Sequence, residues 1–204
     1  LIARSLTSAL PKQQYFDSVY RPRIQADAKI GNEYTYAPFA ISTQLACFNS
    51  TTIKKSPGSI AELEKLSASG KKIGLSTHPF DLIWTAGTQG AISELSSLGS
   101  QSVSDSTYPA IQKWLQWIDS AALYKNISFH KNSRDLGEKL KNNDLDWMAC
   151  WGEQLEDLET TMGNNLGVSA LPNGTTSKAF PTNLIYGFAL GKNSSPIQRE
   201  MAMK

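Results

Sequence analysis

The sequence has few of the side chains that bind metals or act as nucleophiles. It holds only two histidines, His78 and His130, and two cysteines, Cys47 and Cys150, in 204 residues. No CxxC or HxxxH pair occurs, so the spacing matches no zinc motif. A GxSxG nucleophile elbow, a phosphate-binding loop and a dinucleotide fingerprint are also absent. We therefore expect no metal, no cofactor and no catalytic residue, and we do not expect an enzyme.

The charges of the chain nearly cancel, and long apolar runs are absent. Twenty Lys and Arg residues stand against eighteen Asp and Glu residues, which gives a formal net charge of +2 and a pI of about 8.5. No basic run stands out, so we expect no nucleic-acid partner. No segment approaches the ~18 apolar residues that span a bilayer, and no signal peptide is visible. The chain starts at Leu1 without Met and stops at Lys204 in a helix-like run, so we expect neither end to be a natural terminus.

Short apolar segments alternate along the chain with amphipathic ones. The apolar segments predict strands at residues 41–48, 71–77, 126–129, 145–150, 166–171 and 182–190. The amphipathic segments predict helices at residues 2–10, 60–68, 79–98 (broken near 87–90), 108–122, 134–141, 153–161 and 196–204, with Ser133 as one N-cap and a polar loop at 100–107. This alternation predicts an α/β fold with a mostly parallel sheet flanked by helices.

Two junctions between a strand and a helix carry aromatic and polar side chains. They are residues 76–84 (STHPFDLIW) and 148–154 (MACWGEQ). Ligands of such sheets bind at the carboxyl ends of the strands. The rings of Phe80, Trp84 and Trp151 suit stacking on a sugar or another flat apolar face. A place in the core is the alternative for each ring, and it is least favoured for Trp151, which follows its strand directly.

Polar residues at the same junctions are the candidate hydrogen-bonding groups. His78 and Asp81 follow the first strand, and Gln154 follows the second. A lone histidine is more often structural than functional, so both interpretations of His78 stay open. No paired carboxylates occur there with the spacing of a general acid and base.

The two cysteines allow two interpretations. Cys47 and Cys150 each lie in an apolar strand-like segment. Two buried reduced thiols are favoured, because free cysteine is among the most buried residue types. A single disulfide joining neighbouring strands is the alternative, and an oxidising compartment would permit it.

Four stretches carry a resemblance to a known family when they are taken in order. Residues 34–49 place an aromatic-flanked proline before an apolar strand that ends in Phe-Asn. Residues 76–84 place Pro-Phe directly after a strand, and residues 145–154 deliver a tryptophan from a strand. Residues 166–190 continue with a Leu-Pro turn and a final apolar strand. In this order the stretches resemble the extracytoplasmic solute-binding proteins of ABC importers, in particular the maltose-binding-protein-like carbohydrate branch.

The resemblance implies roles for single residues. Phe80 matches the ring that stacks on the sugar, and Trp151 matches the ring that a strand delivers to the cleft. Pro38 and Phe39 match the segment that crosses between the lobes beside the ligand. His78 stands where the family has an acid.

The resemblance also implies an architecture. It is that of a type II periplasmic binding protein, with a remnant of the first lobe and the hinge entry at residues 1–40. The second α/β lobe would cover residues 41–178, and residues 179–204 would hold the hinge return and the start of a first-lobe helix. Hinge motion is expected near Pro38 and Phe180.

The function implied is non-covalent capture of a small polar solute, with a sugar favoured. The partner implied is the membrane permease of an ABC importer, and the location is the periplasm or the cell exterior. A polyamine or another small cation is the alternative ligand class. A sensor or interaction domain, or an enzyme built on a binding-protein fold, is the alternative function.

Overall fold

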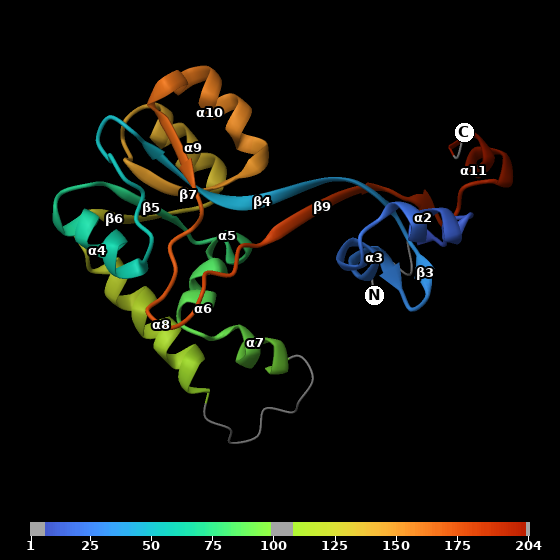
Figure 1. Ribbon diagram of the computed structural model, residues 1–204, viewed down its shortest axis with the longest axis horizontal. Coiled ribbons are helices and arrows are strands. Elements are labelled where there is room, and N and C mark those ends of the chain that lie inside the picture. The colour runs from blue at the N-terminus through green and yellow to red at the C-terminus, as the bar shows by residue number, and fades with distance from the viewer. Residues whose placement is uncertain (1–6, 99–107, 203–204) are drawn as a thin grey trace. The chain divides into compact units, whose positions relative to one another are not determined.

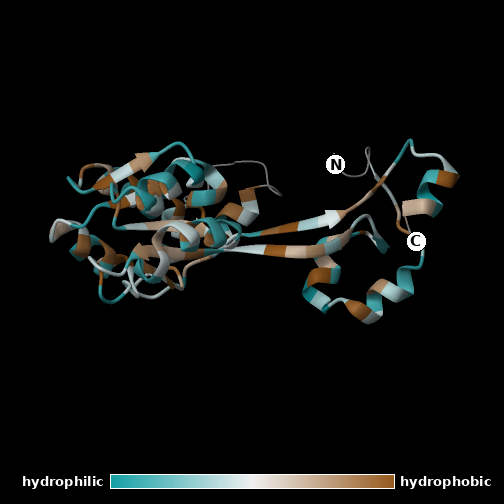
Figure 2. Ribbon diagram, turned by 90° about the horizontal axis from the view of Figure 1, so that it is seen from above, coloured by the Kyte–Doolittle hydropathy of each residue, from teal (hydrophilic) through white to brown (hydrophobic). Residues whose placement is uncertain are grey.

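The computed structural model describes residues 7–98 and 108–202 (Figure 1). The chain divides into two compact units: unit 2 spans Thr43–Asn183, and unit 1 combines the segments up to Ser42 and from Leu184. It passes between them along β4 (Ala37–Asn49) and at the start of β9 (Asn183–Phe188), and these two strands pair with each other. Figure 2 shows hydrophobic residues along both strands. The loop predicted at residues 100–107 lies outside the described residues.

Unit 2 is built on a mixed sheet. Its order is β6-β5-β7-β4-β8, with β9 also paired to β4. The strands are β5 (Ile73–Ser76), β6 (Ile127–His130), β7 (Trp147–Trp151) and β8 (Leu166–Ser169). Strand β5 lies between β6 and β7 and is parallel to both, whereas β4 is antiparallel to β7 and β8. The parallel strands therefore end at one common edge.

Helices cover both faces of this sheet. Figure 1 shows α9 and α10 over one face and α4 and α8 over the other. The helices of unit 2 are α4 (Ile60–Ala68), α5 (Pro79–Leu82), α6 (Trp84–Thr88), α7 (Ile92–Leu98), α8 (Pro109–Ala122), α9 (Ser133–Lys141) and α10 (Leu155–Met162), with short 3-10 turns η1 (Gly152–Gln154) and η2 (Gly163–Asn165). The predicted α/β class with helices on the sheet is confirmed.

The alternation of side chains along β7 creates two separate cores. Trp147 and Ala149 face a cluster that includes Leu63 of α4 and Trp84 of α6. Met148 and Cys150 of β7 belong to a second cluster. It also contains Leu136 and Leu140 of α9 and Leu158 of α10. Successive residues of a strand point to opposite faces, so one five-residue strand supplies both layers.

A disulfide lies inside the second core. Cys47 of β4 and Cys150 of β7 are bonded, with a Cα–Cα distance of 5.8 Å and a sequence separation of 103. The two cysteines are not direct partners in the ladder, since Cys47 faces Met148 and Cys150 faces Leu45. The favoured interpretation of two reduced thiols is therefore wrong for this structure. Strands β4 and β7 are neighbours in the sheet, as the disulfide alternative requires.

Unit 1 is a small assembly of short elements. They are β1 (Thr7–Ser8), α2 (Gln13–Val19), α3 (Pro22–Ala28), β2 (Lys29–Ile30), β3 (Glu33–Tyr34), β10 (Leu190–Gly191) and α11 (Pro196–Ala202). The strand β1 pairs antiparallel with β10, which contradicts the helix predicted at residues 2–10 where that range is described. The extended conformation of β1 depends on pairing with a segment about 180 positions away in the chain. No local sequence pattern reveals such a distant partner.

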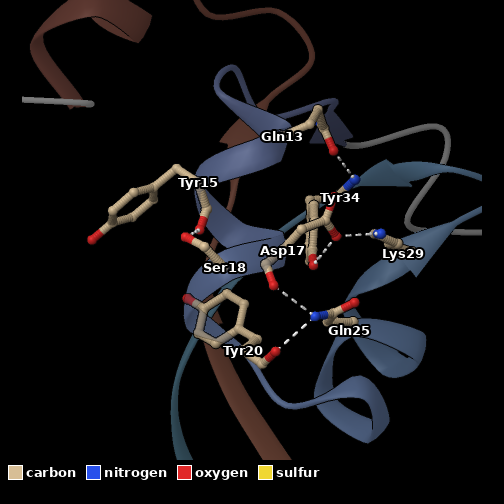
Figure 3. Close-up of polar contacts among 8 residues, drawn as sticks. All are labelled: Gln13, Tyr15, Asp17, Ser18, Tyr20, Gln25, Lys29 and Tyr34. Atoms are coloured by element: carbon tan, nitrogen blue, oxygen red, sulfur yellow. Dashed lines mark hydrogen bonds and ion pairs between the residues drawn. The ribbon is translucent and has the colours of Figure 1, made fainter.

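A polar cluster fastens α2 to β2 and β3 in unit 1 (Figure 3). The Asp17 carboxylate accepts hydrogen bonds from Lys29 Nζ at 2.6 Å and from the Tyr34 hydroxyl at 2.8 Å. Tyr34 is buried, and this burial, with the hydrogen bond to Asp17, raises the pKa of its phenol to about 12. The Gln25 side-chain amide donates to the backbone carbonyls of Asp17 and Tyr20 and so holds α3 against α2.

Across residues 7–98 and 108–202, no helix has the length and apolar character that crossing a membrane requires.

Candidate functional site

The carboxyl ends of β5, β6 and β7 meet at one edge of unit 2. Thr77 follows β5, Lys131 follows β6 and Gly152 follows β7, and each is followed within a few residues by a helix. Because β5 is parallel to both neighbours, the three connecting segments lie side by side at this edge. Open α/β sheets bind ligands there. Both predicted junctions are therefore brought together by the fold.

Asp81 ties these three segments together. Its carboxylate accepts hydrogen bonds from the Ser76 hydroxyl at 2.9 Å, the Ser133 backbone N–H at 2.9 Å and the Trp151 indole N–H at 2.8 Å. The side chain is buried, with 7% of the residue exposed. A buried carboxylate is tolerated when such donors replace its water. The structure places Asp81, which is predicted to bind the ligand, at this edge, where its carboxylate holds the ends of β5, β6 and β7 in place.

Gln154 makes a second bridge between the same segments. Its side-chain oxygen accepts from the Trp151 backbone N–H at 2.8 Å, and its side-chain nitrogen donates to the Ser133 carbonyl at 3.0 Å. Ser133 is thus held at both its N–H and its carbonyl. The predicted N-cap is displaced by one residue, because Asn132 caps α9 by accepting from Asp135 N–H, while the Ser133 N–H points to Asp81.

Phe80 is the predicted stacking ring that the structure leaves open. The residue is 62% exposed on α5, directly after the end of β5. The exposed His78 ring lies beside it, with 5.8 Å between the ring centroids. Thr77, also exposed, is fixed because its N–H and its hydroxyl both donate to the His130 carbonyl. An apolar ring and two polar side chains are therefore presented together.

The two predicted tryptophans are covered. Trp84 is completely buried in the first core and offers no surface to a ligand. Its ring packs against that of Trp147, with 6.0 Å between the ring centroids. Trp151 is 3% exposed and its indole N–H is taken by Asp81. The assignment of Trp84 to the ligand site is thus replaced by a core position. Trp151 lies at the predicted edge, but with its ring enclosed.

Pro38 and Phe39 belong to unit 1. Pro38 is buried and its carbonyl accepts a hydrogen bond from the Tyr20 hydroxyl at 2.8 Å. Phe39 is exposed and stacks on Phe188 of β9, with 4.7 Å between the ring centroids. Both residues lie on β4 and belong to unit 1, whereas the edge formed by β5, β6 and β7 belongs to unit 2.

Gln44 is the residue of this region that the sequence reasoning missed. The residue is 2% exposed on β4, and its side-chain nitrogen donates to the backbone carbonyls of Phe80 at 3.2 Å and Asp81 at 3.0 Å. Its side-chain oxygen accepts from the Thr182 N–H at 3.0 Å. A glutamine in a segment predicted to be a buried strand was the available signal, since a buried amide needs partners.

His130 at this edge is shifted towards its neutral form. Burial, with a smaller contribution from Lys139, lowers the pKa of His130, whose Nε2 lies 2.8 Å from the Ser128 hydroxyl. Among the described residues, no group of three or more acidic, histidine or cysteine side chains has the geometry to hold a metal ion. A cavity of about 610 Å³ opens beside the edge between α9 and α10, and its polar lining includes Ser133, Arg134 and Gln154.

No family model matches the chain, and no curated protein sequence matches it. Solved structures do match, among them the GacH receptor of Streptomyces glaucescens GLA.O, determined unliganded and in complex with acarbose and an acarbose homolog. The TM-score is 0.81 at 17% identity, over 98% of this chain and 56% of the receptor, so the chain spans about half of that protein. At this identity the likeness concerns the fold, and the chain has an α/β fold like that of the periplasmic binding proteins.

Proposed function

We propose that the chain belongs to an extracytoplasmic solute-binding protein and that unit 2 contacts a small polar solute, with a sugar as the favoured class. Capture would be non-covalent and without catalysis. The fold likeness to a receptor whose structures include bound acarbose supports this proposal. The edge formed by the ends of β5, β6 and β7 is the proposed contact surface.

The observation that carries the proposal is the exposure of Phe80. A phenylalanine that is 62% exposed on a short helix after a buried strand has no packing role that explains its position. Sugar rings present C–H groups that stack on such an aromatic face. The neighbouring side chains of Thr77 and His78 would serve as hydrogen-bond partners for hydroxyl groups.

The state of Asp81 favours a neutral solute over a polyamine. A cation would be recognised by carboxylates at the edge, and Asp81 is the carboxylate that the sequence places nearest to Phe80. Its two oxygens already accept three hydrogen bonds from within unit 2. A polyamine that used Asp81 would have to displace these donors, whereas a sugar needs only a ring face and neutral polar groups.

The proposal includes a partner and a location. The partner is the permease of an ABC importer, and the location is the periplasm or the cell exterior. The disulfide between Cys47 and Cys150 supports such a location, because disulfides persist in oxidising compartments. We also keep the domain assignment as a proposal: residues 1–40 and 179–204 as first-lobe and hinge segments around a second lobe at 41–178.

A thermal-shift panel tests the proposed function. The chain would be heated with mono- and oligosaccharides, with spermidine and putrescine, and with divalent metals. A ligand in hundredfold excess over its dissociation constant stabilises the folded state by about 2.7 kcal/mol, which is a visible shift of the midpoint. We expect stabilisation by at least one saccharide. A response confined to polyamines or to metals would contradict the proposal.

A further inference from the structure

The side chain of Gln44 joins three segments of unit 2. Its nitrogen donates to the carbonyls of Phe80 and Asp81, and its oxygen accepts from the Thr182 N–H. The backbone N–H of Gln44 also donates to the Thr182 carbonyl at 3.2 Å. Both donors and the acceptor of this buried amide are therefore used, so the turn that carries Phe80 is bound to two other parts of the chain.

These parts are the two points at which the chain leaves unit 2. Gln44 stands on β4 two positions after Ser42, the last residue of the first segment of unit 1. Thr182 directly precedes β9, which continues into unit 1 from Leu184. The Thr182 hydroxyl adds a direct hydrogen bond to the Phe80 carbonyl at 3.3 Å. One glutamine thus fixes both crossing strands to the turn of Phe80.

We propose that Gln44 is a positioning residue that couples the Phe80 turn to both crossing strands, so that solute contact at Phe80 is transmitted to β4 and β9. Separating the turn from the strands would leave the Asp81 carbonyl and the buried Gln44 amide without partners, which is costly. The turn and the strand segments therefore move as one body. This inference rests on the proposed function for its solute, but the coupling itself is a property of the ligand-free chain.

A neighbouring pair provides a matched control. The Thr43 hydroxyl donates to the Asn183 side-chain oxygen at 2.7 Å, so it also joins β4 to β9. Thr43 is the residue next to Gln44, and its hydrogen bond is exposed. Thr43→Val removes a bond between the crossing strands without touching the turn.

Hydrogen exchange measured by mass spectrometry tests the coupling in the ligand-free chain. The variant Gln44→Met keeps the side-chain volume and removes the three hydrogen bonds. We expect exchange to rise about tenfold, the change that 1.4 kcal/mol produces, in peptides covering residues 79–84 and 182–188 together. Thr43→Val should leave residues 79–84 at the wild-type rate. Thr182→Val loses only the hydrogen bond from its hydroxyl to the Phe80 carbonyl, so it should raise exchange at residues 79–84 by a smaller factor. This variant also tests the coupling if Gln44→Met does not fold.

The second arm adds maltose as the probe. In the wild-type chain, maltose should slow exchange in both peptides, and in the Gln44 variant it should slow only residues 79–84. If maltose and the other saccharides fail to bind while the ligand-free exchange behaves as stated, the proposed function is wrong and the positioning role stands. The positioning role would be overturned if residues 79–84 exchanged at the wild-type rate both in folded Gln44→Met and in Thr182→Val.

Discussion

The indole N–H of Trp151 donates to the Asp81 carboxylate over 2.8 Å, although the two residues lie 70 positions apart in the sequence. This bond joins the end of β7 to the helix that follows β5. The indole of Trp151 is enclosed at this bond, whereas Phe80 on the same helix as Asp81 is exposed. The edge thus combines one buried aromatic that supports the site with one exposed aromatic that faces solvent.

Removal of the Asp81 carboxylate should destabilise unit 2. Asp81→Ala leaves three donors without acceptors, on Ser76, Ser133 and Trp151. Each buried donor left unsatisfied costs about 1–3 kcal/mol, and partial access of water to the gap reduces the sum, so we expect a loss of roughly 2–4 kcal/mol in the free energy of unfolding. Urea denaturation followed by circular dichroism measures it. The control is Asp119→Ala on the exposed face of α8, and equal losses in the two variants would refute the role given to Asp81.

The disulfide should contribute to stability. It closes a loop between residues separated by 103 positions, and loss of a native disulfide typically costs about 2–5 kcal/mol. The sulfurs are buried, so dithiothreitol reaches them only after the chain has been unfolded. We expect the chain reduced in this way to have a lower denaturation midpoint than the chain with the disulfide intact. A thiol assay under denaturing, non-reducing conditions is the decisive check. We expect no free thiol, and two free thiols per chain would show that the pair is reduced.

Acidification should weaken the fold through His130. Its pKa is lowered in the folded state, chiefly by burial, so the unfolded chain binds its proton more readily. The stabilisation is therefore present above the unfolded pKa of about 6.5 and is lost as the pH falls from there through the lower folded pKa. Denaturation midpoints at pH 7.5 and pH 5.0 measure the effect. His130→Gln should reduce the pH dependence, and an unchanged slope would count against this origin.

Gly74 should not accept a side chain. A Cβ there would lie 2.4 Å from Leu145 Cδ1 and 2.6 Å from Leu136 Cδ2, in the second core. Overpacking of this kind costs about 1–3 kcal/mol, so Gly74→Ala should lower the denaturation midpoint. Gly58→Ala is the control, since its nearest neighbour would be Glu62 Oε2 at an ordinary 3.6 Å. Equal midpoints for the two variants would show that the core can rearrange.

The sequence predicted the elements of unit 2 and the meeting of two junctions at one edge. Periodicity sufficed there, because each helix and strand has a local pattern of apolar residues. It did not predict which rings are open. Phe80 and Trp84 are four positions apart, yet one faces solvent and the other fills the core, since α6 begins at Trp84 and turns that side chain inward.

The partners of buried polar groups were also beyond the sequence. Gln44 contacts Asp81 across 37 positions, and Cys47 bonds to Cys150 across 103. These contacts depend on which strands lie side by side and in which register, and no local pattern encodes either. The strand β1 illustrates the same limit, because its conformation follows from pairing with β10 near the other end of the chain.

Isothermal titration of the wild-type chain and of Phe80→Ala tests the central claim most directly. The ligand is the saccharide that gives the largest shift in the thermal panel. Tyr124→Ala serves as the control, because Tyr124 is an exposed aromatic of unit 2 just after α8. We predict that Phe80→Ala weakens binding about tenfold or more at an unchanged denaturation midpoint, while Tyr124→Ala binds as the wild type does. Equal dissociation constants for the wild type and Phe80→Ala would contradict the assignment of this edge as the solute-binding surface.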